Sequence, residues 1–198
     1  MARYTGPKIK ISRRYGVKLG LRSNEEAFTR RPYKPGQHGP SARRTRRSEY
    51  GTQLVEKQKA KFVYGILERQ FSNYYKKAAK SQNVGLALMQ LLETRLDTIV
   101  FRAGFATTQN QARQFVTHGH VQVDGKKVSI PSFQVLPGMK VSLDKDLRKL
   151  IEEQRGQSSE IPVWLKVDTK SAVILDQPTR DQIPNIINEQ LIVEYYSR

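Results

Sequence analysis

The stretch Thr108–Ile130, TQNQARQFVTHGHVQVDGKKVSI, joins a short helix pattern to a hairpin pattern. Thr108 followed three residues later by Gln111 is typical of a capped helix start, and a helix over 109–117 puts its apolar side chains on one side. Asp124-Gly125 between two short apolar-polar runs is a strong hairpin signal. The stretch therefore predicts a small unit with one buried helix face and one hydrogen-bonding face.

The second face of this helix is polar, which favours nucleic acid as a partner. We expect Arg113 to be exposed there, beside polar neighbours at helical spacing, and the first amides of the helix to suit a phosphate. We also expect Arg95 and Arg102 to meet phosphate from the preceding helix. The candidate contact residues in this part of the chain are Arg95, Arg102, Thr107, Thr108, Asn110, Gln111, Arg113, Gln114, Thr117, His118, His120, Lys126 and Lys127.

The charge of the whole chain supports the same partner. Thirty-five Lys and Arg face eighteen Asp and Glu in 198 residues, a formal net charge of +17. The first fifty residues hold 14 basic and 3 acidic side chains, whereas 144–198 is slightly acidic. Such a charge repels itself unless a polyanion neutralises it, so RNA, DNA and an anionic membrane surface are the candidate partners.

Residues 1–47 are expected to form a basic arm with little core of its own. Prolines and glycines break regular structure there, and aromatic residues alternate with arginines, which favours an arm that orders on RNA over a solvated tail. The candidate contact residues of the arm are Arg3, Tyr4, Lys8, Lys10, Arg13, Arg14, Arg30, Arg31, Tyr33, Lys34, His38, Arg43, Arg44, Arg46 and Arg47.

Helices are expected after the arm. Ser48-Glu49 begins the first, with an imperfect inner stripe of Leu54, Lys57, Lys61 and Tyr64 or Phe62. Glu68–Lys80 carries Phe71, Tyr74, Tyr75 and Ala78 at helical spacing, which favours core over base stacking. Further candidates for RNA contact are Lys57, Lys59 and Arg69.

A third, longer helix is predicted from Val84 to Ala103, ended by Gly104. Strands are predicted at 139–143, and a second hairpin at 163–167 and 172–175; residues 145–155 are left as helical or irregular. An amphipathic helix over 185–196 is expected to pack Leu191 and Tyr195 on the helical domain.

The motifs Arg95-Leu-Asp97, Phe101-Arg-Ala-Gly-Phe-Ala-Thr-Thr108, Gln111–Val116 and His118–Val128 resemble the RNA-binding module named after ribosomal protein S-four. Arg31–Pro40, Glu68-Arg-Gln-Phe71 and the ending Asn188–Arg198 extend the resemblance to the bacterial ribosomal protein family over essentially the whole chain. The resemblance implies an α+β fold with a basic arm at 1–47, a helical domain at 48–93 completed by 182–198, and the RNA-binding domain at 94–181.

The resemblance also implies a function. Members of the family are structural constituents of the small ribosomal subunit in the cytoplasm, bind the 5′ domain of its RNA early and nucleate assembly. They contact ribosomal protein S-five, where the interface affects decoding accuracy, and their basic residues line the channel through which messenger RNA enters. Many members hold zinc through four N-terminal cysteines; this chain has no cysteine, so we expect no metal and no cofactor.

Three alternatives remain open on the sequence alone. A pseudouridine synthase would place its catalytic aspartate in an Arg-Leu-Asp sequence such as 95–97, but no catalytic domain is left beside the module. His118 and His120 with only His38 make a poor zinc set. A basic protein that binds DNA or membrane does not explain the module, and neither a leader nor a membrane span is expected. A small-molecule substrate is not expected either.

Overall fold

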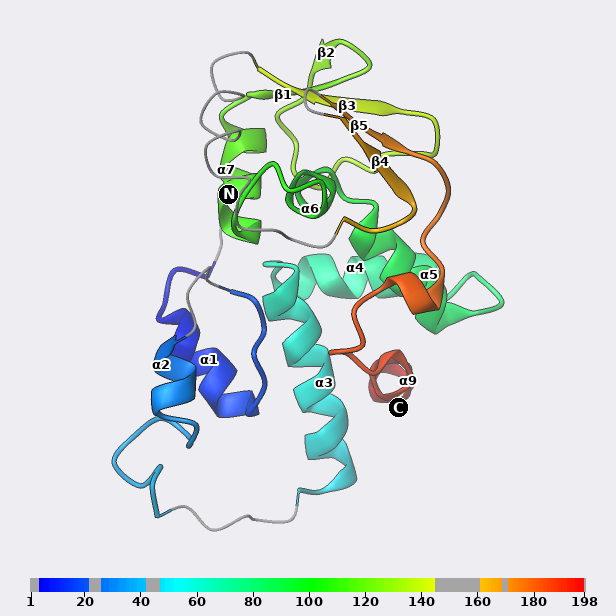
Figure 1. Cartoon of the computed structure of the whole chain (residues 1–198). Coiled ribbons are helices and arrows are strands. Elements are labelled where there is room, and N and C mark those ends of the chain that lie inside the picture. The colour runs from blue at the N-terminus through cyan, green and yellow to red at the C-terminus, as the bar shows by residue number, and fades with distance from the viewer. Residues whose placement is uncertain (1–3, 22–25, 42–46, 145–160, 169–170, 198) are drawn as a thin grey trace. The chain divides into compact units, whose positions relative to one another are not determined.

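A computed structural model describes residues 4–21, 26–41, 47–144, 161–168 and 171–197, and the chain divides into two compact units (Figure 1). Unit 1 comprises Met1–Leu88 and Pro184–Arg198, and unit 2 comprises Met89–Ile183. Helices make up unit 1, while unit 2 combines helices with an antiparallel sheet, so the fold is α+β as expected.

The centre of unit 1 is made by α3 (Glu49–Val63), α4 (Glu68–Ala78) and α9 (Glu189–Tyr196). The Ser48 side chain caps α3 by accepting a hydrogen bond from Gly51 N at 3.1 Å, as its place before the helix predicts. The buried side of α3 is formed by Gln53, Glu56, Lys57 and Ala60. Of the predicted stripe, Lys57 and Tyr64 are buried, whereas Leu54, Lys61 and Phe62 are half-buried. The stripe was therefore right only in part, because polar side chains of α3 find partners on α9 and α4.

Polar and aromatic contacts hold α9 in place. Gln53 Nε2 donates to Glu194 Oε2 at 3.0 Å, and the Tyr196 ring stacks on Tyr75 with 4.4 Å between centroids. The helix begins at Glu189, later than predicted, because the Asn188 side chain accepts from Gln190 N and caps it. Ile192 is fully buried, whereas Leu191 and Tyr195 are half-buried. The most deeply buried residue on this side of α9 is therefore Ile192, the residue after the expected Leu191.

Residues 4–21 and 26–41 form more structure than a bare arm. They contain α1 (Lys8–Tyr15) and α2 (Glu26–Arg30), and Ile11 and Leu19 are buried. Gly16 ends α1 in the left-handed region at φ 72°, and its N–H donates to Ser12 O. The glycines and prolines of this segment separate short helices and do not prevent them, so the expectation of little regular structure was wrong.

Unit 2 is built on a five-stranded antiparallel sheet in the order β2-β1-β3-β5-β4. The strands are β1 (Val121–Val123), β2 (Lys126–Lys127), β3 (Lys140–Leu143), β4 (Leu165–Val167) and β5 (Ser171–Ile174). Both predicted hairpins are present: β1 pairs with β2 and β4 with β5. Residues 145–155 lie outside the described part.

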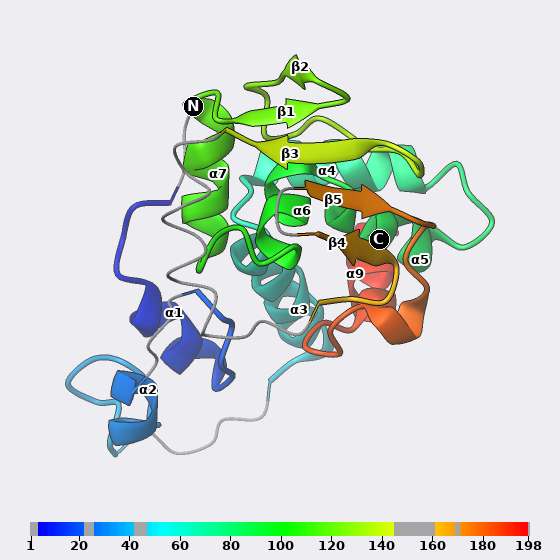
Figure 2. The same ribbon diagram turned by 45° about the horizontal axis from the view of Figure 1, so that its top comes forward.

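Two helices, α6 (Leu96–Arg102) and α7 (Gln109–Thr117), cover one face of this sheet (Figures 1 and 2). Their buried side chains join the alternating inward residues of the strands in one core, which includes Ile99, Val116, Val141 and Trp164. A short 3-10 turn, η1 (Arg180–Gln182), follows the sheet.

The long helix predicted over 84–103 was wrong, because it is two helices. The first is α5 (Val84–Glu93), and Arg95 then takes an extended conformation (φ −68°, ψ 141°) before α6. Arg95 forms a β-bridge with Gln134, and Val135 N donates to Thr94 O at 2.9 Å. Strand-like pairing with residues 133–135 replaces the helix at this point, and helical spacing of apolar residues does not reveal such a break.

Candidate nucleic-acid interface

The helix α7 is set by its cap and its apolar face. Thr108 Oγ1 accepts from Gln111 N at 3.3 Å, as predicted, while Gln111 Oε1 accepts from the N–H and the hydroxyl of Thr107 at 2.8 and 2.7 Å. The reciprocal bond therefore goes one residue further back than in a standard capping box. Ala112 and Val116 are fully buried against the core.

Arg113 does not face solvent, which corrects the sequence expectation. Its Nη1 lies 3.2 Å from Asp97 Oδ2, and only 9% of its side chain is exposed. Arg95 also binds Asp97, through Nε at 2.9 Å and Nη2 at 2.6 Å. The exposed fractions of the Arg95 and Asp97 side chains are 0% and 1%. One buried carboxylate thus holds two arginines that we expected on the RNA-facing side.

Arg102 is similarly engaged. Its Nε and Nη2 donate to the two carboxylate oxygens of Glu93 at 2.9 and 2.7 Å, and the Glu93 side chain is buried. Such a two-point pair fixes the guanidinium in direction as well as position. Sequence reasoning missed Glu93 altogether and considered Asp97 only as a catalytic residue. Carboxylates placed near arginines in the sequence would have been the signal.

The polar surface left on this part of unit 2 is mostly uncharged. Gln114, Thr117 and His118 are exposed on α7 and its end. Gly119 (φ 76°), two residues after the end of α7, lies beside the end of the Lys127 side chain of β2. Further exposed candidates are Thr107, Lys126 and Lys127, and half-buried ones are Thr108, Asn110, Gln111 and His120. The helix end and the hairpin therefore form one continuous surface, which we call the module surface.

Two candidate lysines on α3 are also engaged inside unit 1. Lys57 Nζ, on a buried side chain, lies 2.8 Å from Glu68 Oε1, and Lys59 Nζ lies 2.6 Å from Glu56 Oε1. Lys61 Nζ reaches Glu68 Oε2 at 2.8 Å. The charges of these lysines are therefore neutralised within unit 1. Arg69, in contrast, is exposed.

The close contacts of this cluster change the pKa values of Glu68, Lys57 and Tyr196. Partial burial raises the pKa of Glu68, but the hydrogen bonds and charges of Lys57 and Lys61 outweigh it and lower the pKa from 4.5 to about 2. Burial lowers the pKa of Lys57, but the hydrogen bonds and charges of Glu68 and Tyr195 together outweigh burial and raise the pKa. Burial, helped by the nearby Glu68 carboxylate, raises the pKa of Tyr196, whose hydroxyl donates to Glu68 Oε1 at 3.0 Å.

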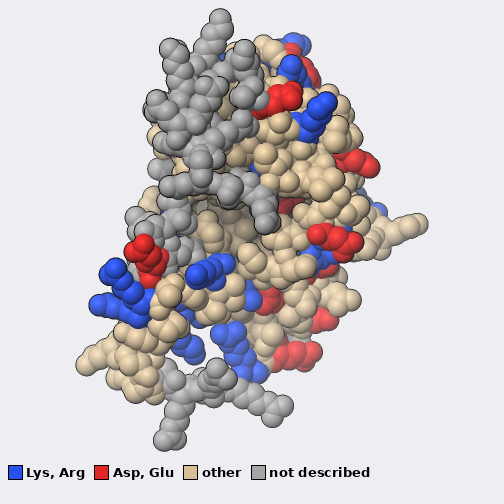
Figure 3. All heavy atoms as spheres, in the orientation of Figure 1, with Lys and Arg blue, Asp and Glu red and all other residues tan. Residues whose placement is uncertain are grey.

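Exposed cations gather instead in the first part of unit 1, and Figure 3 shows Lys and Arg side chains over the region of α1. Arg13 Nε donates to Tyr33 O at 3.0 Å, and its guanidinium lies 5.0 Å from the centre of the Tyr33 ring. The exposed candidates here, which we call the arm surface, are Tyr4, Lys10, Arg14, Arg30, Arg31, Tyr33, Lys34, His38 and Arg47. Lys8 and Arg13 are half-buried, and Arg3, Arg43, Arg44 and Arg46 lie outside the described residues.

Neither a metal centre nor a membrane span is found in the described part of the chain. In those ranges, no group of three or more His, Cys, Asp or Glu side chains is arranged to hold a metal ion. His118 and His120 have ring centroids 6.2 Å apart. No described helix has the length and apolar character needed to cross a membrane.

Known proteins are similar in sequence to this chain over its whole length. Residues 3–93 match the family model of the ribosomal protein S4/S9 N-terminal domain, and residues 94–141 match that of the S4 domain. Proteins named small ribosomal subunit protein uS4 are 46% identical in Roseiflexus castenholzii, 49% in a Geobacillus species and 48% in Lactococcus lactis. All of this chain and 99–100% of each relative are covered. The chain belongs to the uS4 family of ribosomal proteins.

Proposed function

We propose that this chain is an RNA-binding constituent of the small ribosomal subunit that holds ribosomal RNA through contacts of both the arm surface and the module surface. The general part of this proposal rests on membership of the uS4 family over the full length of the chain. The chain is a structural protein of the small subunit that binds its RNA, and it is not an enzyme.

The division of labour between the two surfaces is the finer part of the proposal. The arm surface offers exposed cations and aromatic rings, which suit phosphates and unstacked bases of any sequence. The module surface offers hydrogen-bonding side chains and two lysines on a rigid helix and hairpin, which suit a particular RNA shape. The arm surface would therefore supply most of the affinity, and the module surface most of the selectivity.

Early binding to the 5′ domain and nucleation of assembly are proposed from the family resemblance. The test is binding of the purified protein to protein-free small-subunit RNA, followed by chemical footprinting. We expect a footprint confined to the 5′ domain, with an unrelated duplex and DNA of equal length as competitors. Binding that requires other ribosomal proteins to be added first would contradict the primary role.

Contact with ribosomal protein S-five, an effect on decoding accuracy and a place beside the channel for messenger RNA are further proposals from the same resemblance. Crosslinking within assembled subunits tests them, since a lysine-reactive reagent would join the two proteins and a photoreactive messenger would label exposed arm residues. Subunits that give neither product would contradict both contacts.

A further inference from the structure

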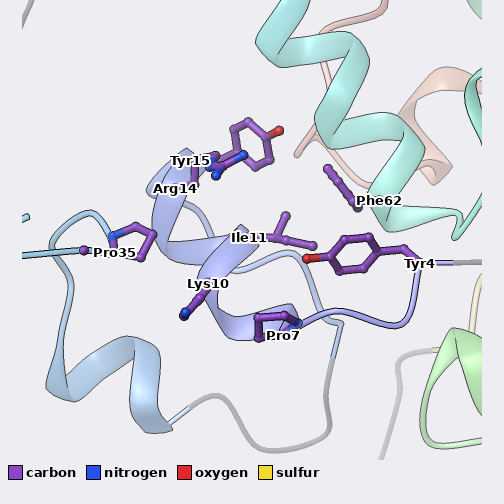
Figure 4. A pocket seen from close by; sticks show the side chains of 9 residues that line it. Tyr4, Pro7, Lys10, Ile11, Arg14, Tyr15, Pro35 and Phe62 are labelled. Atoms are coloured by element: carbon purple, nitrogen blue, oxygen red, sulfur yellow. The ribbon is translucent and has the colours of Figure 1, made fainter.

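A pocket of about 320 Å³ lies along one face of α1 within unit 1 (Figure 4). Pro7, Lys10, Ile11, Arg14 and Tyr15 line it, at the spacing that puts residues on one side of a helix. The remaining walls come from segments before and after α1: Tyr4, Pro35, Gly36 and Phe62.

Aromatic rings dominate one end of this pocket. The rings of Tyr4 and Phe62 meet edge to face with 5.3 Å between centroids, and those of Tyr15 and Phe62 lie 6.2 Å apart. Tyr4 is 43% exposed, so one part of its ring is uncovered. Gly6 makes this placement possible, because a side chain there would collide with the Tyr4 hydroxyl.

The charges at the pocket are of one sign. Lys10 and Arg14 are exposed on the rim, and the nine lining residues include no carboxylate. Neither Lys10 nor Arg14 takes part in an ion pair among the described residues. This contrasts with the carboxylate-bound Arg95, Arg102 and Arg113. A ligand with a flat apolar part and negative charge beside it fits this chemistry.

We propose that this pocket receives one unstacked nucleotide of the ribosomal RNA, with the base against Tyr4 and Phe62 and its phosphates at Lys10 and Arg14. The inference rests on the proposed RNA-binding function and adds a specific site to it. Aromatic faces stabilise bases of any identity, and cations at the rim hold the backbone. A volume of about 320 Å³ is within the range of small-ligand pockets and accommodates one nucleotide rather than a helical duplex.

Tyr4→Leu and Phe62→Leu in the full-length chain test the base contact, because leucine keeps apolar bulk and loses the flat face. The control is Tyr50→Leu, which removes an exposed ring of the same unit outside the pocket. Binding to small-subunit ribosomal RNA should weaken roughly fivefold or more in each pocket variant, the lower end of the effect of losing a base stack. Tyr50→Leu should stay within about twofold.

A salt series separates the base contact from the phosphate contacts. Tyr4→Leu and Phe62→Leu should leave the slope of log affinity against log salt unchanged. Lys10→Gln with Arg14→Gln should instead flatten that slope by up to ~0.9 for each phosphate that is no longer neutralised. A base-reactive probe should find one nucleotide that the unchanged protein protects and that both leucine variants expose.

Three results decide against the proposals, and they differ. A wild-type protein that does not bind the RNA overturns the proposed function. RNA binding that Tyr4→Leu and Phe62→Leu leave as intact as Tyr50→Leu overturns the pocket alone. If Phe62→Leu lowers the unfolding midpoint, its effect on RNA binding is not informative, and the variant at the more exposed Tyr4 is used instead. An RNA affinity of Tyr4→Leu equal to that of the wild type would show that the aromatic cluster only packs α1 against its neighbours.

Discussion

Arg14 of α1 and the arginines of the module have opposite environments, although all of them belong to a strongly basic chain. Arg14 is exposed at the rim of a pocket without carboxylates. Arg95 and Arg113 are buried on Asp97, and Arg102 is held by Glu93. Positive charge in a sequence therefore indicates a polyanion partner for the protein, but the position of buried carboxylates decides which cations are available to it.

The strongest test of this contrast removes the shared carboxylate of unit 2. Asp97→Ala removes the carboxylate that binds the buried Arg95 and Arg113, and loss of one member of a buried ion pair costs about 3–5 kcal/mol. We expect the midpoint of urea unfolding to fall accordingly. Trp164, the single tryptophan, is buried in the core of unit 2, so its fluorescence reports that unit.

The matched control for this variant is Asp181→Ala, which removes an exposed carboxylate of the same unit. Its unfolding free energy should stay within about 0.5 kcal/mol of the wild-type value. Equal behaviour of the two variants would mean that Asp97 does not hold the arginines in solution.

The second test makes the same substitution in both environments. Arg113→Gln breaks a contact to Asp97, which keeps Arg95, so a smaller loss of about 1–3 kcal/mol is expected. Arg14→Gln should leave the unfolding free energy within about 0.5 kcal/mol and weaken RNA binding instead. The sequence alone predicts the reverse for Arg113, an RNA contact with no role in stability. An unchanged unfolding midpoint of Arg113→Gln with weaker RNA binding would favour that sequence-based interpretation.

The third test asks whether the position of the arm cations matters beyond their number. Changing Arg30, Arg31 and Lys34 to glutamine should weaken RNA binding and flatten the salt slope by up to ~0.9 for each phosphate that is no longer neutralised. The control removes the same charge from exposed Lys76, Lys77 and Lys80 at the end of α4 and beyond it. Substitution is preferable to deleting the arm, because Ile11 and Leu19 are buried.

Equal decreases in affinity in these two triple variants would show that only net charge is sensed, and the arm surface would then have no special place. Preference for ribosomal RNA over an unrelated duplex should survive in both variants, because the module surface is unchanged. If the arm variant keeps its affinity and loses its preference, the arm is the part that selects the RNA.

Local signals in the sequence predicted those parts of the fold that local chemistry decides. The helix start at Ser48-Glu49, the Thr108 cap, the Asp124-Gly125 turn and the β4–β5 hairpin are confirmed, because each depends on residues close together in the chain. The break at Arg95 was missed, because residues 133–135, about forty positions away, supply the pairing that replaces the helix.

The candidate contact residues were less predictable for the same reason. Polar spacing on α7 correctly indicates the exposed Gln114 and Thr117, but it treats Arg113 as their equal. Arg113 is drawn inward by Asp97, sixteen residues earlier on another helix. An amphipathic pattern cannot distinguish a solvated cation from one whose counter-charge arrives through tertiary folding.

The smallest expected effect concerns Glu68, which extends internal charge pairing to unit 1. Its pKa of about 2 in the folded chain lies below the ordinary 4.5, so the ionised carboxylate stabilises the fold above about pH 4.5, and this contribution is lost as the pH falls toward 2. Its side chain is 48% exposed, so solvent screening limits the contribution to about 1 kcal/mol or less. Glu68→Gln should lower the unfolding free energy at pH 7 by that amount, and the difference from wild type should shrink between pH 5 and pH 2. Glu49→Gln, at an exposed position on α3, is the control. If the difference stays constant down to pH 2, the ionised carboxylate of Glu68 does not carry the effect, and the contrast between paired and exposed cations would then rest on unit 2 alone.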